Sequence, residues 1–120
     1  MKIAISSLEN NEHSQAADRF ARCEYFIIYD HETLNFTSVE NTAKTAGSGA
    51  GGKAVKILGD LDVEVVLAPE LGPKALEALQ AFEMKSYQYP RDKTVREVLY
   101  LYYENKLPEL LISTSKGRHQ

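Results

Sequence analysis

The stretch EYFIIYDHETLNFTSVEN, residues 24–41, decides the fold because it has the pattern of two strands joined by a polar turn. Its first part, EYFIIYD (24–30), is a continuous run of β-branched and aromatic residues, typical of a strand that is covered on both faces. The second part, HETLNFTSVEN (31–41), follows a tight polar turn and is expected to pair back as a hairpin. A hairpin this early in the chain predicts a mixed sheet rather than a fully parallel one.

Strands that alternate with helices complete the predicted order. Besides the hairpin, strands are expected at 2–6, 63–67 and 84–89, the last of them at an edge of the sheet. Apolar residues at helical spacing follow a glycine-rich stretch, and Gly59 is expected to stop that helix. Further helices are predicted at 71–82, with Pro73 in the first position, and from Thr94, which forms a capping box with Glu97. This alternation predicts a three-layer α/β/α domain.

The composition limits the classes of partner. The chain has 120 residues, of which 43% are hydrophobic and 26% charged, as is usual for one soluble globular domain. A net charge of −3 argues against a nucleic-acid partner, because phosphate backbones select basic surfaces. The apolar run YFIIY (25–29) is too short to cross a bilayer, and MKIAISSLEN (1–10) lacks a signal-peptide pattern. A cytoplasmic protein without membrane partners is therefore expected.

The stretch TAGSGAGGKAVKIL, residues 45–58, is the first candidate for a binding site. Glycine lets the backbone approach a ligand closely, and the free N–H groups at the start of a helix favour an anion. The stretch also fits G-x-G-x-x-G at 47–52, but a polar linker replaces the tight strand-to-loop turn that dinucleotide binding requires. The plain alternative is a solvated loop followed by a closely packed helix.

Five segments, taken in order, carry a family resemblance. They are RFARCEYFIIYD (19–30), VEN (39–41), GSGAGGKAVKIL (47–58), DVEVVLAPELGPKALEAL (62–79) and TVREVL (94–99). Together they resemble the NifX/NifB-type dinitrogenase iron–molybdenum cofactor biosynthesis family over residues 1–107, which leaves 108–120 as a C-terminal tail. The resemblance implies a ribonuclease-H-like fold, a mixed five-stranded sheet in the order 3-2-1-4-5 with strand 2 antiparallel. The better-studied members bind or carry iron–molybdenum-type clusters or their precursors.

This topology brings distant segments to the edge where the parallel strands end, which is where open α/β sheets commonly bind ligands. The predicted cofactor-binding residues are Arg19, Arg22, Cys23, Gly47, Ser48, Gly49, Ala50, Gly51, Gly52 and Lys53. The arginines are expected to supply countercharge and to favour the thiolate form of Cys23, a soft metal ligand.

Cys23 and His13 are the predicted metal ligands, His13 only because its loop is expected at the same edge of the sheet. Many cofactor-binding members of the family carry a histidine where this chain has Arg19. Cys23 would replace that histidine in kind but not in position. The plain alternatives are a small buried hydrophobe at Cys23 and a surface side chain at His13. One helical turn is also expected in the polar segment 7–23, with Ser14 as its cap.

The resemblance implies a non-enzymatic carrier or storage protein for an anionic metal–sulfur cluster, iron–molybdenum-type or another iron–sulfur cluster, bound transiently. Cluster-assembly or acceptor proteins would be its partners. A nuclease is not expected, because the first strand KIAIS (2–6) contains no acid to help hold two metal ions. Two alternatives stay open: a phosphate- or nucleotide-binding module, and a regulatory or protein-interaction domain that uses YLYYE (100–104) and LPELLI (107–112).

Overall fold

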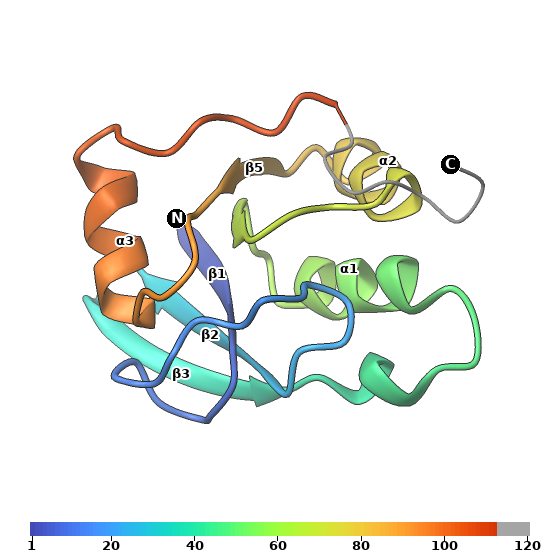
Figure 1. Cartoon of the computed structure of the whole chain (residues 1–120), viewed down its shortest axis with the longest axis horizontal. Coiled ribbons are helices and arrows are strands. Elements are labelled where there is room, and N and C mark those ends of the chain that lie inside the picture. The colour runs from blue at the N-terminus through green and yellow to red at the C-terminus, as the bar shows by residue number, and fades with distance from the viewer. Residues whose placement is uncertain (113–120) are drawn as a thin grey trace.

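The computed structural model describes residues 1–112, which form one mixed sheet with helices on both faces (Figure 1). The elements are β1 (Lys2–Ser7), β2 (Tyr25–Asp30), β3 (Asn35–Glu40), the 3-10 helix η1 (Thr42–Thr45), α1 (Ala50–Asp60), β4 (Val65–Ala68), α2 (Pro73–Ala81), β5 (Lys85–Gln88) and α3 (Val95–Tyr103). The strands lie in the order β3-β2-β1-β4-β5. β2 is antiparallel to both of its neighbours, whereas β4 and β5 run parallel to β1. The predicted fold class, strand order and reversed second strand are confirmed.

The hairpin of β2 and β3 forms as predicted. Tyr25 pairs with Glu40 at one end and Asp30 with Asn35 at the other. The turn between them closes when the Leu34 N–H donates to the Asp30 carbonyl over 2.8 Å. Because β3 again runs in the direction of β1, its carboxyl end and the segment that follows it reach the same edge of the sheet as the end of β1.

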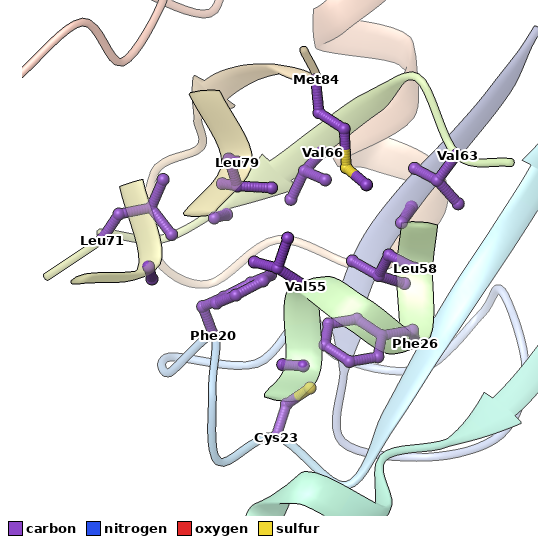
Figure 2. Close-up of a cluster of buried hydrophobic side chains, with 14 of the residues drawn as sticks. Phe20, Cys23, Phe26, Val55, Leu58, Val63, Val66, Leu71, Leu79 and Met84 are labelled. Atoms are coloured by element: carbon purple, nitrogen blue, oxygen red, sulfur yellow. The ribbon is translucent and has the colours of Figure 1, made fainter. Parts of the chain in front are cut away.

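The two faces of the sheet enclose two separate cores. Phe26 and Val66 point towards α1 and α2, where they pack with residues such as Leu58 (Figure 2). Ile27 and Leu67 point to the opposite face and pack against α3. Successive residues of a strand face opposite sides, so a strand with helices on both faces needs an unbroken apolar run. The continuous YFII of β2 has this origin.

Two local predictions are wrong. Gly59 does not end its helix, because α1 continues to Asp60; a Cβ at Gly59 would lie only 3.1 Å from the Phe82 ring, so this glycine makes room for an aromatic side chain. The segment 7–23 contains no helical turn capped by Ser14. The Ser14 hydroxyl instead shares a hydrogen bond with Ser7, and the segment is held by backbone bonds to its neighbours. The start of α2 at Pro73 and the capping box at Thr94 are confirmed.

The first part of the predicted tail belongs to the packed structure. The Gln88 N–H donates to the Pro108 carbonyl over 2.9 Å, and the Leu110 N–H donates to the Ser86 carbonyl over 2.8 Å. Leu110 is 5% exposed and lies in the core beside α2. Residues 113–120, the remainder of the predicted tail, lie outside the described residues. Within residues 1–112, none of the helices has the length and apolar character needed to span a membrane.

Candidate functional site

Asn41 joins the start of β2 to the segment that follows β3. Its side chain is fully buried and donates through Nδ2 to the carbonyls of Ala21 and Cys23, each over 2.9 Å. Its Oδ1 accepts the Ala43 N–H over 3.1 Å and so caps η1. One amide therefore fixes two chain segments that lie about twenty positions apart in sequence.

Arg22 extends this connection towards the glycine loop. Its guanidinium donates to the carbonyls of Lys44 and Ala46, each over 2.8 Å. Lys44 in turn binds the Glu24 carboxylate over 2.5 Å, and this hydrogen bond raises the Lys44 pKa. The loop at 46–49 is thus anchored at its first residue, and the predicted meeting of 19–24 with the glycine stretch is observed.

The N-terminus of α1 lies at the end of this anchored loop. Gly49 is its N-cap residue in a left-handed conformation, with φ of +71°, and within residues 1–112 no side chain caps the helix. Gly47, Ser48 and Gly49 are exposed, as is Lys53 on the first turn. The N–H groups of the first turn and the helix dipole therefore face an open surface beside a lysine, an arrangement that attracts anions.

The glycines of this stretch have different surroundings. A Cβ at Gly51 would lie 3.0 Å from the Ala75 Cβ, so this glycine allows α1 and α2 to pack closely. Gly47, Gly49 and Gly52 would place a Cβ in open space, and among these only Gly49 requires the positive φ that favours glycine. Ala50, in the same stretch, is buried. The interpretations of the glycine stretch as an open loop and as a helix-packing surface thus apply to different residues.

Cys23 faces the core rather than the loop surface. The thiol is 2% exposed, donates to the Tyr25 carbonyl over 3.2 Å, and points into the side-chain cluster beside α1 (Figure 2). Burial raises the Cys23 pKa to about 12. The prediction that the neighbouring arginines favour a thiolate is therefore wrong, because burial removes the solvation that a thiolate needs.

His13 lies apart from Cys23 and the glycine loop. Its segment binds the first turn of α3, where the N–H groups of Val95 and Arg96 donate to the carbonyls of Ser14 and Glu12. α3 covers the face of the sheet opposite to α1. The imidazole is exposed and lies 3.7 Å from the Glu12 carboxylate. Among residues 1–112, no three His, Cys, Asp or Glu side chains are grouped in a way that could hold a metal ion.

A second feature of the same sheet edge is a hollow of about 430 Å³ beyond the ends of β4 and β5. Its lining includes Asp18, Arg91 and Lys106, and Arg19 follows Asp18 in the chain with an exposed side chain. Arg91 and Lys106 were not predicted from sequence. Nothing in the sequence around Arg91 or Lys106 marks these two residues, because the hollow forms only when 106–108 folds back along β5.

The structural role of Asn41 was also not predicted from the sequence. The sequence signal was present, since an asparagine directly after a strand is a typical helix cap, but the helix that it caps is a short 3-10 helix without apolar periodicity.

Fold and site together define a small α/β domain with an open helix N-terminus at the carboxyl edge of a mixed sheet. Residues 1–105 match the family described as dinitrogenase iron–molybdenum cofactor, and the chain belongs to that family.

Two solved structures and one sequence relative agree with this assignment. The apo form of the orange protein from Desulfovibrio gigas is 28% identical, with a TM-score of 0.91 over 95% of this chain and 96% of that one. A NifB-like protein from Thermotoga is 40% identical, with a TM-score of 0.85 over 97% of this chain and 98% of that one. An uncharacterised protein of Methanocaldococcus jannaschii is 29% identical over 110 residues, which are 89% of each chain.

Proposed function

We propose that this protein is a non-enzymatic carrier or storage protein for an anionic metal–sulfur cluster or its precursor, in cofactor biosynthesis. The observation that carries the proposal is the open N-terminus of α1, which follows an exposed loop and which no side chain of the described residues 1–112 caps. Membership of a family described by the iron–molybdenum cofactor supports an anionic metal–sulfur cargo rather than another anion.

The cargo would lie over residues 47–53. Backbone N–H groups of the first turn of α1 would donate to its sulfur atoms, and Lys53 would supply positive charge. Arg19 would add a second charge from the neighbouring segment. Arg22 already donates to two carbonyls, so it would act by holding the loop in place. Gly51 would contribute its N–H group while it packs on α2.

The proposal assigns Cys23 and His13 no role as metal ligands at this loop. Cys23 would have to leave the core and lose a proton whose pKa is about 12. We therefore expect Cys23→Ser to take up cargo as the wild type does. A loss of uptake in this variant, with unchanged stability, would restore the thiolate as a ligand.

The direct test is anaerobic incubation with isolated iron–molybdenum cofactor, followed by desalting, metal analysis and absorption spectroscopy. The decisive pair of variants is Lys53→Glu and Lys56→Glu, since both residues are exposed on α1 and both changes alter the net charge equally. Only Lys53 lies in the first turn, whereas Lys56 lies one turn further along and pairs with Asp60 over 3.3 Å.

An exposed pair of opposite charges contributes about 0.2–1 kcal/mol, and reversing one charge about doubles the change, so Lys53→Glu should bind the cargo about two- to thirtyfold more weakly. Lys56→Glu should bind nearly as well as the wild type. Equal losses in both variants would point to the overall charge instead of the loop. If no cofactor is taken up and inorganic phosphate or a nucleotide raises the melting temperature, the phosphate-binding alternative holds.

A further inference from the structure

The hollow of about 430 Å³ beyond the ends of β4 and β5 is lined by charges of both signs. Its charged residues within the described range are Asp18, Glu70, Arg91 and Lys106, and all four are exposed. The volume falls in the range of small-molecule pockets, which is about 300–1,000 Å³. Because two acids face two bases, the hollow matches neither a simple anion nor a simple cation.

The two acids come from the β1 and β4 side of the hollow. The Ala17 N–H donates to the Ser6 carbonyl over 3.0 Å, which places Asp18 beyond the end of β1. Glu70 follows the end of β4, the next strand in the sheet. Both carboxylates therefore lie on the side of the hollow nearer the middle of the sheet.

The two bases come from the β5 side. Arg91 follows the end of β5, which is the last strand in the order of the sheet. Lys106 belongs to the segment that runs back along the outer side of β5, where the Gln88 N–H donates to the Pro108 carbonyl (Figure 1). The charges are thus separated by sign across the hollow.

These charges are available to a ligand. Within residues 1–112, none of the four side chains forms an ion pair or a hydrogen bond.

Hydrogen bonds to the end of β5 hold the walls of the hollow in place. The Tyr89 hydroxyl donates to the Ala17 carbonyl over 2.5 Å, next to Asp18. Gln88 Nε2 donates to the Pro69 carbonyl over 2.8 Å, and the Gln88 N–H donates to the Pro108 carbonyl over 2.9 Å. The three walls are therefore fixed without a ligand, as is usual for small-molecule sites. Apolar surface between the charges comes from Pro69, Pro90 and Pro108.

We propose that this hollow binds a small zwitterion of the length of a dipeptide. Its ammonium group lies towards Asp18 and Glu70, and its carboxylate lies towards Arg91 and Lys106. An arginine guanidinium can bind a carboxylate through two parallel hydrogen bonds. Neighbouring strands are about 4.8 Å apart, and a dipeptide extends over at most about 7 Å, so its two ends reach both sides. A single α-amino acid carries both charges on one carbon atom and spans less.

This proposal goes beyond the proposed function and rests on other residues. An anionic cluster in the hollow would meet the carboxylates of Asp18 and Glu70, whereas the first turn of α1 contains no acidic residue. The tests below contain no metal–sulfur cluster, so their outcome does not depend on the uptake of cargo at the glycine loop.

NMR titration of the full chain with three probes tests the charge pattern. The probes are alanyl-alanine, its N-acetyl derivative, which lacks the ammonium group, and its amide, which lacks the carboxylate. Alanyl-alanine should shift the amide signals around the hollow and should bind about two- to fivefold more tightly than either other probe. Unchanged signals up to the solubility limit of alanyl-alanine overturn the proposal. Equally tight binding of the N-acetyl derivative or of the amide also overturns it, because the hollow would then be an anion or a cation site.

Two variants assign the two ends of the ligand. Glu70→Gln should bind alanyl-alanine about two- to fivefold more weakly and should not weaken binding of the N-acetyl derivative. Arg91→Gln should weaken alanyl-alanine binding to the same extent and should not weaken binding of the amide. The amide spectrum of each variant checks that the fold is kept.

The matched controls are Glu77→Gln on α2 and Arg96→Gln on α3, since both residues are exposed and lie outside the lining of the hollow. Both controls should bind alanyl-alanine like the wild type. Equal losses in a variant and its control would attribute the effect to overall charge and overturn the proposal.

Discussion

Asn41→Ala should strongly destabilise the protein. The change removes three hydrogen bonds of a fully buried amide, to the Ala21 carbonyl, the Cys23 carbonyl and the Ala43 N–H. At about 1 kcal/mol for each bond, the loss is about 3 kcal/mol. The Ala21 carbonyl is partly exposed and regains water, whereas the other two groups stay dry, which gives a range of about 2–4 kcal/mol. A domain of this size has about 5–15 kcal/mol of stability, so the variant should still fold.

Urea unfolding followed by circular dichroism measures this difference directly. Thr42→Ala is the matched control, because Thr42 is the next residue and its side chain is exposed. This control should stay within about 0.5 kcal/mol of the wild type. The Cys23 thiol should also react faster with a thiol reagent in Asn41→Ala, since the amide holds the segment that buries it. A loss below about 1 kcal/mol would refute the assignment of Asn41 as the joint between the two segments.

Three further predictions test the packing around the site. Burial raises the Cys23 pKa to about 12 in the folded protein, so the thiol of the unfolded chain loses its proton at a lower pH. The free energy of unfolding should therefore fall as the pH rises above about 8.5. In Cys23→Ala, which lacks the thiol, it should fall less steeply. Urea titrations at successive pH values would contradict this if both proteins followed the same slope. Tyr89→Phe removes a hydroxyl that donates to a buried carbonyl and should cost about 1–3 kcal/mol. Gly51→Val should lose about 1–3 kcal/mol more than Gly52→Val, because only Gly51 contacts α2; equal losses would disprove the close helix contact.

The strands and the three α-helices were predictable, apart from the end of α1, because local signals agreed with the tertiary structure. The unbroken apolar run of β2, Pro73 at the start of α2 and the capping box at Thr94 all had a single interpretation. Gly59 had two interpretations, because a glycine near the end of a helix can end the helix or can leave room for a neighbouring side chain. The Phe82 ring that fills this gap comes from a distant segment.

The site was less predictable than the fold. The convergence of 19–24 with the glycine loop followed from strand direction, and Arg22 confirms it by direct hydrogen bonds. The protonation state of the Cys23 thiol depends on how deeply the side chain is buried, and no local sequence pattern predicts this depth. His13 was expected at the edge of the sheet where the parallel strands end. Backbone hydrogen bonds join its segment to α3, which covers the face of the sheet opposite to α1.

The strand edge that Pro108 and Leu110 cover is completed late in protein synthesis. All five strands leave the ribosome before residues 108–110, so a nascent chain displays the free backbone groups of β5 until these residues emerge. During this interval two chains on neighbouring ribosomes are exposed to intermolecular strand pairing, as edge strands are in general. The closure of this edge of β5 requires the chain to be translated at least as far as Leu110.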